Sequence, residues 1–281
     1  RFAGDNAADI GPLPYVSDAT PGFHGTLWTN TTFNLAGSPY TLQGDMTVPA
    51  GVTVTIDPGV TLQWTSGSDI MGAGSDTARG ELIVNGTLAA NGTAASPVVL
   101  KSTAVAANSW YGVVVNAGAT AATLANVNLQ GGSYGVTSAA PGSVLSATGV
   151  AMTSTSYGFT INAGTPTLTS VSVTGGQTAV TVNGSAAPTL ASSTILNTLS
   201  GGINYYTNGA ALTSNITNTV VSGCGSYGVL AQATSGSLTI NLTNDTIHAS
   251  GSRGVWAYAN PGASTTMNVK NSIVTQQSWG I

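Results

Sequence analysis

The chain has 281 residues, of which only 5% are Asp, Glu, Lys or Arg, and its formal net charge is −4. Soluble domains ordinarily carry about 25% charged residues, so solubility here must come from Ser, Thr, Asn, Gln and the backbone. No acid, base or histidine lies between Ser102 and Asn244. This excludes nucleic-acid binding by phosphate neutralisation, which needs several Lys or Arg. No apolar run reaches the ~18 residues that cross a bilayer, so we expect no membrane span.

Residues 1–22 contain three prolines and three acids and show little periodicity. We interpret them as an irregular N-terminal arm or linker, either packed on the surface or docked on a neighbouring subunit. The chain begins at Arg1 without an apolar leader segment, so we expect a processed product whose signal peptide has been removed. The predicted location is therefore extracellular or at the cell surface. The single Cys224 excludes an internal disulfide framework.

A residue pattern typical of β-strands begins near Gly25. Val52, Val54 and Ile56 alternate with threonines, which is the period-2 pattern of strands with one buried face. Pro and Gly residues at 49–51 and 57–59 supply turns between these strands.

The sequence of this segment is similar to that of a known group of proteins. The phrases Trp28-Thr29, Ser38-Pro39-Tyr40, Val48-Pro49-Ala50-Gly51-Val52 and Val84-Asn85-Gly86-Thr87-Leu88 resemble the opening of secreted bacterial right-handed parallel β-helix proteins of the pectin-lyase-like superfamily. The resemblance implies the fold and a secreted or cell-surface location. It implies no single activity, because that superfamily includes lyases, hydrolases, tailspikes and non-catalytic surface proteins.

Residues 110–281 repeat a short phrase: a small or aromatic residue, then glycine, then an apolar residue. Counted at the glycine or its substitute, the copies lie at 112, 135, 158, 179, 202, 228, 254 and 280, in steps of 23, 23, 21, 23, 26, 26 and 26. Such a repeat of β-formers and turn residues is typical of a β-solenoid. With the resemblance, it predicts an all-β fold: one right-handed parallel β-helix over residues 23–281, with coils of about 21–28 residues.

Two further patterns accompany the phrase. Apolar pairs precede and follow each glycine, so equivalent residues should stack into core ladders along the axis. Asparagines tolerate the left-handed conformation that sharp turns need, and four of them stand just ahead of the upstream strands: Asn126, Asn218, Asn244 and Asn271. We expect these to mark one corner of the coil and insertions to form loops on the remaining side.

The aromatic residues of the phrase admit two interpretations. If they point outward, Tyr111, Tyr134 and Tyr157 form a ladder of rings that could receive sugar rings or a protein partner. If strict alternation holds, glycine points outward and the aromatic residue is directed inward or into a corner, where it serves packing.

Candidate catalytic residues are few. Hydrolysis of a glycosidic bond normally needs two carboxylates, yet from Ser102 onward the one acid is Asp245. Asp245, His248 and Arg253 lie within two coils and are the candidates for a lyase site. The competing interpretation treats them as scattered solvated residues.

The acids of the N-terminal part suggest a possible calcium site. Asp69, Asp76 and Glu81 lie in or beside the glycine-rich loop 67–80 and are its candidate ligands. The alternative is a solvated loop with a charge pair between Asp76 and Arg79. We expect no other cofactor.

The leading functional hypothesis is a non-enzymatic, extracellular structural or adhesive protein. The chain stops at Ile281 inside a copy of the phrase, so we expect either a longer natural protein or self-association through the β-helix ends, because an uncapped coil exposes backbone groups. The alternative is a polysaccharide-binding or polysaccharide-degrading β-helix. Binding of ice or a crystal surface by threonine rows ranks third, because the threonines do not keep one register.

Overall fold

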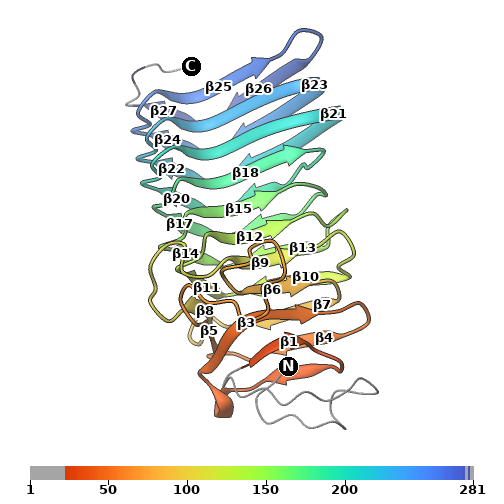
Figure 1. The fold of residues 1–281 in the computed structure, drawn as a ribbon. Coiled ribbons are helices and arrows are strands. Elements are labelled where there is room, and N and C mark those ends of the chain that lie inside the picture. The colour runs from red at the N-terminus through yellow and green to blue at the C-terminus, as the bar shows by residue number, and fades with distance from the viewer. Residues whose placement is uncertain (1–22, 276–277, 279–281) are drawn as a thin grey trace.

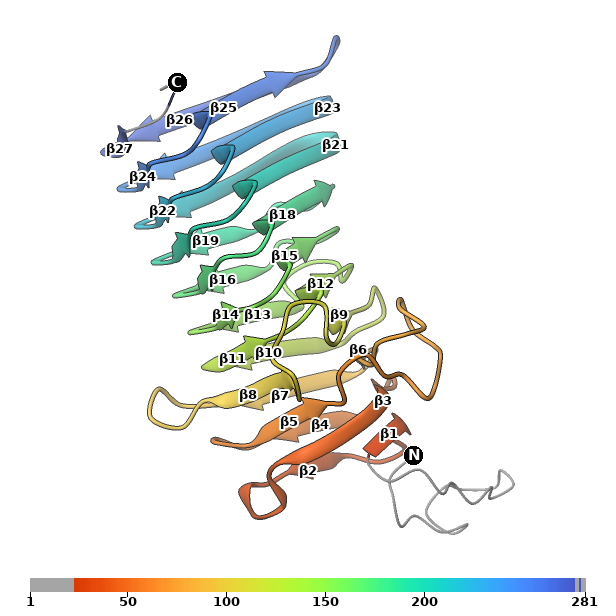
Figure 2. The same cartoon turned by 60° about the vertical axis from the view of Figure 1, so that its left-hand side comes forward.

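The computed structural model describes residues 23–275 and Ser278. These residues form a solenoid in which 27 strands join into one sheet, pairing in parallel from coil to coil. Each coil runs over three faces in the order 1, 2, 3. The coils stack into one elongated column (Figures 1 and 2). The arm predicted for residues 1–22 and the last copy of the phrase at 279–281 lie outside the described residues.

The strands are assigned to faces by their pairing. Face 1 holds β1 (Phe23–Thr26), β6 (Glu81–Val84), β9 (Gly112–Val115), β12 (Tyr134–Ser138), β15 (Tyr157–Ile161), β18 (Thr178–Gly184) and β25 (Arg253–Ala259). Face 2 holds β2 (Thr31–Phe33), β4 (Thr53–Ile56), β7 (Thr87–Asn91), β10 (Ala121–Ala125), β13 (Leu145–Thr148), β16 (Thr167–Thr169), β19 (Thr189–Ala191) and β26 (Ser264–Lys270). Face 3 holds β5 (Thr61–Trp64), β8 (Val98–Ser102), β11 (Val127–Gln130), β14 (Ala151–Thr153), β17 (Ser172–Thr174), β20 (Thr194–Leu196), β22 (Val220–Ser222), β24 (Thr246–His248) and β27 (Ile273–Thr275).

Three longer strands bend from one face to the next. β3 (Tyr40–Val48) pairs with β5 through its first residues and with β6 through its last. β21 (Gly201–Thr217) and β23 (Tyr227–Thr243) continue from face 1 into face 2. A 3-10 turn, η1 (Leu35–Gly37), follows β2. Among the described residues no helix has the length and apolarity that a bilayer crossing requires.

The core consists of ladders of apolar side chains, as the sequence predicts. On face 1 one ladder runs in strict register through seven coils, and every member is buried: Val113, Val136, Phe159, Val180, Ile203, Val229 and Val255. Since each apolar residue contacts its equivalents in neighbouring coils, a coil needs few charges for stability.

The coils differ in length in two separate ways. Met46 pairs with Leu82, 36 positions later, and Leu82 with Val113, 31 positions later, so these two coils exceed the expected range. The extra residues form the loops 65–80 and 103–111 between face 3 and face 1, and in the second coil also the loop 92–97 between face 2 and face 3. In contrast, the 26-residue steps from Ile203 to Val229 and on to Val255 accompany the long strands β21 and β23.

The four asparagines of the predicted corner all adopt a left-handed conformation, with φ between 46° and 59°, and lie between face 2 and face 3. Amide ladders along the axis form on other asparagines. Asn241 Nδ2 donates to Asn215 Oδ1 at 2.8 Å, and Asn268 Nδ2 donates to Asn241 Oδ1 at 2.8 Å.

The glycine of the repeated phrase is buried and the tyrosine is outside, which contradicts the alternation argument. A Cβ at Gly158 would lie 2.2 Å from the carbonyl oxygen of Ala179, and one at Gly135 would lie 2.3 Å from Met152 Sδ. The corner therefore requires glycine because the backbones of adjacent coils approach closely there. Period-2 alternation resumes only after the glycine.

Candidate functional site

Three tyrosines stack along the start of face 1, just before or at the first residue of their strands. The ring centroids of Tyr111 and Tyr134 are 5.1 Å apart at an interplanar angle of 47°, and those of Tyr134 and Tyr157 are 5.1 Å apart at 20°. Tyr157 is 38% exposed and the other two are half-buried. The structure thus forms the outward ladder of rings and places Trp110, the residue before Tyr111, in the core.

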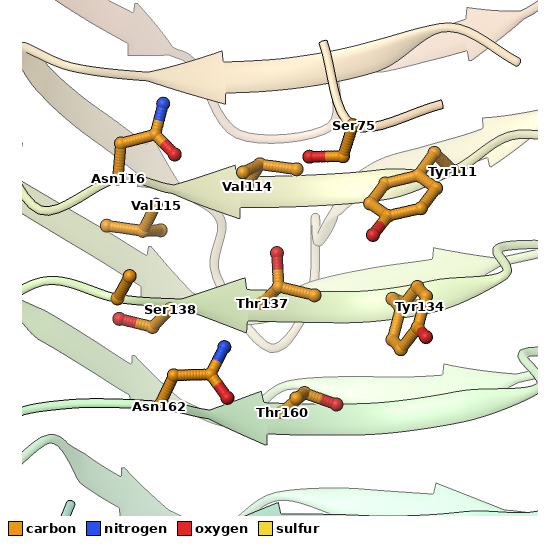
Figure 3. Close-up of a pocket in the computed structure, with 11 residues that line it drawn as sticks. Ser75, Tyr111, Val114, Val115, Asn116, Tyr134, Thr137, Ser138, Thr160 and Asn162 are labelled. Atoms are coloured by element: carbon orange, nitrogen blue, oxygen red, sulfur yellow. The ribbon is translucent and has the colours of Figure 1, made fainter. Parts of the chain in front are cut away.

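A groove of about 300 Å³ lies beside this ladder on the outer surface of β9, β12 and β15. Its floor is a row of residues in pairing register, Val114, Thr137 and Thr160. Asn116 and Asn162 lie at the end opposite the tyrosines, as Figure 3 shows. We call this surface the tyrosine groove. It presents tyrosine rings, hydroxyl groups and amides.

The wall of the groove above Tyr111 is the insertion loop 65–80, which contributes Ser75 (Figure 3). Carboxylates hold this loop by accepting hydrogen bonds from its backbone. Glu81 Oε1 accepts from the amides of Ser75 at 2.8 Å and Asp76 at 2.6 Å. Asp69 accepts from the amides of Met71 at 2.9 Å and Ala73 at 3.2 Å. These side-chain acceptors fix the loop together with backbone hydrogen bonds from the Gly67 amide to Ser109 and from the Ile70 amide to Gln43.

Two of the supporting carboxylates are buried. Glu81 is 0% exposed, and Asp45, whose Oδ1 accepts from the Glu81 amide at 2.8 Å, is 2% exposed. Burial raises the pKa of Glu81 to about 7. Burial, with repulsion from Asp69, raises the pKa of Asp45 to about 6. Their second oxygens, Glu81 Oε2 and Asp45 Oδ2, have no hydrogen-bond partner within the part of the chain that the structure describes. Sequence reasoning did not single out Asp45.

The candidate calcium ligands lie near one another, but their oxygens accept hydrogen bonds from the loop or form an ion pair within it. Asp69 and Glu81 accept from backbone amides, and Asp76 forms an ion pair with Arg79 at 2.8 Å. Arg79 also donates to Ser133 Oγ at 2.9 Å, which joins the loop to the residue before Tyr134. Within the described chain no three His, Cys, Asp or Glu side chains are grouped so that they could hold a metal ion.

The candidate lyase residues are not brought together. Asp245 is buried at the corner before β24, where its Oδ1 accepts from the Thr219 amide at 2.8 Å. His248 ends β24 on face 3, whereas Arg253 begins β25 on face 1 and lies over the ring of Trp256. Within residues 23–275 no hydrogen bond or ion pair joins any two of the three.

Comparisons with known proteins agree with this architecture. A family model described as "Right handed beta helix region" matches residues 111–274. The chain belongs to the right-handed β-helix family. A second model, "Pectate-lyase like beta helix domain", matches residues 25–145 of this β-helix, which confirms the pectin-lyase-like resemblance.

Two further comparisons complete this picture. Comparison with curated proteins gives no significant match. Among solved structures, the catalytic unit of a thermostable GH87 alpha-1,3-glucanase from Streptomyces thermodiastaticus strain HF3-3 is similar with a TM-score of 0.43 and 11% identity. The match covers 83% of this β-helix and 61% of the glucanase chain. The β-helix thus spans less than two thirds of that protein.

The tyrosine groove of this β-helix is electrically neutral at its surface. None of the residues that line it is an acid, a base or a histidine. The nearest carboxylates, those of Glu81 and Asp76, belong to the supporting loop, and Asp76 is neutralised by Arg79. The groove can therefore offer ring stacking and hydrogen bonds to a ligand, without a salt bridge.

Proposed function

We propose that this β-helix is a non-catalytic, extracellular binder of a neutral polysaccharide, and that the sugar chain lies in the tyrosine groove. The observation that carries the proposal is the ladder of partly exposed rings spaced 5.1 Å apart beside a groove of hydroxyls and amides. An aromatic face receives the apolar face of a sugar ring, while hydroxyls and amides pair with the hydroxyls at its edge.

The preference for a neutral chain follows from the charges. A polysaccharide of acidic sugars needs Arg, Lys or a bound cation to offset its charge, and the groove lining contains no Arg or Lys. Asp45 and Glu81 lie under the adjoining loop and Asp69 and Asp76 lie within it, and among the described residues the ion-paired cation of this group is Arg79, which contacts Asp76. This local excess of acid disfavours a polyanionic ligand.

The burial and hydrogen bonding of the carboxylates favour binding of the polysaccharide over its hydrolysis. A glycosidase needs two carboxyl groups on opposite sides of the scissile bond. Glu81 and Asp45 are buried, and Gly74 covers Glu81 so closely that a Cβ there would lie 2.6 Å from Oε2. Asp69 and Asp76 use their oxygens on backbone amides and Arg79.

The polysaccharide-binding reading takes precedence over a purely structural role because a defined groove favours it. An adhesive role is compatible with it, since a protein that binds a polysaccharide also attaches to surfaces made of one. Self-association through the β-helix ends remains a prediction, which sedimentation velocity over a range of protein concentrations would test.

The proposal is tested by measuring affinity for a panel of soluble neutral and acidic polysaccharides. We expect binding to at least one neutral polymer and a loss of about tenfold in Tyr134→Thr, because threonine already occupies the same row at Thr178. Trp28→Ala is the control, as it removes a ring that is 59% exposed outside the groove.

Two outcomes would count against the proposal. Equal binding by wild type and Tyr134→Thr would show that the groove is not the site. Release of new reducing ends or unsaturated sugars by the wild-type protein would favour the enzymatic alternative.

A further inference from the structure

The far end of face 1 carries a second group of rings. Tyr206, Tyr227, Trp256 and Tyr258 lie on β21, β23 and β25, and Figure 1 shows these strands stacked beyond β18, toward the C-terminal end of the column. The rings of Tyr227 and Trp256 are 5.1 Å apart, and those of Trp256 and Tyr258 are 6.0 Å apart. Tyr206 is 39% exposed and Tyr258 is 44% exposed.

The pairing register places Tyr227 and Trp256 in the same rows as the tyrosine groove. Tyr227 continues the row of Tyr134 and Tyr157 through Thr178 and Gly201. Trp256 lies in the same row as the groove floor. From the floor to Trp256 this row consists of Thr137, Thr160, Thr181, Asn204 and Leu230, and of these five only Leu230, which pairs with Trp256, is apolar. One uncharged strip therefore connects the two groups of rings.

Asn204 fills a gap in the strip. Gly201 lacks a side chain in the tyrosine row, and a Cβ there would lie 2.4 Å from both the amide nitrogen and the amide oxygen of Asn204. Asn204 Nδ2 donates to the Tyr206 hydroxyl at 3.4 Å. Asn204 Oδ1, in a side chain only 4% exposed, is buried and has no hydrogen-bond partner among the described residues. A buried acceptor without a donor costs free energy, so a ligand hydroxyl that pairs with it would add affinity.

The floor under the rings is apolar although it does not belong to the core. Leu230 alternates with the core residues Val229 and Ala231, so it points to the outer side. Nevertheless it is only 3% exposed. Leu230 and the second group of rings thus form one continuous apolar surface.

Arg253 supplies hydrogen-bond donors at the edge of this surface. Its guanidinium lies 4.2 Å from the ring centroid of Trp256, and in the described part of the chain it forms no ion pair. A guanidinium fixed on a ring keeps its N–H groups available for oxygen acceptors.

We propose that Asn204, Tyr206, Tyr227, Arg253 and Trp256 form a second glycan-contact site, which binds a later segment of the same neutral chain that occupies the tyrosine groove. This inference rests on the proposed function. Six strand pairings separate β9 from β25, which is ~29 Å at ~4.8 Å per pairing. Only a chain that spans this length can use both sites, and joining them increases its affinity.

The test uses one neutral polymer that the wild type binds and a series of its oligosaccharides of increasing length. In wild type, affinity should rise steeply once the oligosaccharide reaches the second site. Trp256→Ala should abolish this rise, weaken polymer binding roughly tenfold and leave the shortest oligosaccharides unaffected. Tyr227→Thr, which copies Thr178 of the same row, should do the same and guards against a folding defect of Trp256→Ala.

The possible failures can be told apart. If Tyr134→Thr weakens binding while Trp256→Ala and Tyr227→Thr bind the polymer like wild type, the second site is overturned and the groove stands. If none of the three variants changes binding, the proposed function is overturned as well. If Trp256→Ala changes the sedimentation coefficient without changing polymer affinity, the rings are a contact between copies of this chain, and the proposal is again overturned.

Discussion

Asp245 accepts a hydrogen bond through Oδ1 from the backbone amide of Thr219, one coil earlier, at 2.8 Å. The same arrangement recurs at this corner. Ser193 Oγ accepts from the Val171 amide, Thr219 Oγ1 from the Ser193 amide, and Ser272 Oγ from the Asp245 amide. Asp245 is therefore one member of a side-chain ladder that otherwise uses hydroxyls. This placement explains its burial without a catalytic role.

Replacement of Asp245 by threonine should make the protein more stable above about pH 6. Burial raises the pKa of Asp245 from 3.8 to about 6, so the folded protein holds this proton to higher pH than the unfolded chain does. Stability consequently falls as pH rises from about 4 to about 6, by on the order of 3 kcal/mol at most. Asp245→Thr keeps an acceptor for the Thr219 amide and removes the titration.

Thermal unfolding at a series of pH values checks this prediction. Wild type should lose more stability between about pH 4 and pH 6 than Asp245→Thr, which keeps the losses due to Asp45 and Glu81 but not that of Asp245. Asp245→Ala is the matched control: it also removes the titration but leaves the Thr219 amide unpaired, so it should be less stable than Asp245→Thr by about 1 kcal/mol. Parallel pH profiles for wild type and both variants would refute the assignment.

Substitution of the phrase glycine should destabilise the β-helix. In Gly158→Ala the new Cβ would meet the Ala179 carbonyl oxygen at 2.2 Å, and backbone atoms cannot move aside without disturbing the next coil. We expect a loss of roughly 1 to 3 kcal/mol, measured by denaturant unfolding. Gly118→Ala is the control, because no atom lies within 4 Å of its Cβ position. Equal stability of the two variants would contradict the close-approach explanation.

The asparagine ladder on face 2 predicts that alanine substitutions of its members lower thermal stability by different amounts. Asn241 makes two amide bonds, to Asn215 and Asn268, whereas Asn268 makes one of these. Each exposed bond contributes about 0.5 to 1 kcal/mol, so Asn241→Ala should lower the thermal midpoint more than Asn268→Ala. The reverse order would show that the ladder adds little and that other contacts dominate.

The fold could be predicted from the sequence because its determinants are local and repeated. The ladder from Val113 to Val255 and the left-handed Asn126 and Asn244 follow from spacing and residue type alone. The direction of Tyr134 could not be decided, because alternation fails at Gly135, where the close approach of the next coil forces a corner.

The candidate site depends on contacts that spacing does not encode. Asp45 is a lone acid in a strand, and it is buried only because loop 65–80 folds over it, held by Glu81. Proximity in sequence groups Arg253 with Asp245. The pairing register instead places it next to Tyr227 and over Trp256, a relationship that requires the coil lengths on both sides.

The two buried carboxyls should make loop 65–80 sensitive to pH. In the folded protein the pKa is raised to about 7 for Glu81 and to about 6 for Asp45. The folded loop therefore retains these protons longer than the open loop. Its stability is greatest in acid and falls as pH rises from about 4 to about 7, because burial removes the carboxylates from water when they become charged and nearby carboxylates add repulsion.

Hydrogen exchange of the 65–80 segment checks this prediction. After correction for the intrinsic effect of pH, the amides of Ser75 and Asp76, which donate to Glu81, should lose protection between about pH 4 and pH 7. Glu81→Gln should retain protection at the higher pH, since its side-chain oxygen can still accept both bonds without a charge. Segment 201–217 serves as the internal reference.

The same pH change should affect glycan binding, because Ser75 lines the tyrosine groove. Loss of protection in wild type should be accompanied by weaker binding, and Glu81→Gln should abolish both effects together. Binding that weakens equally in Glu81→Gln would show that the loop does not control the groove.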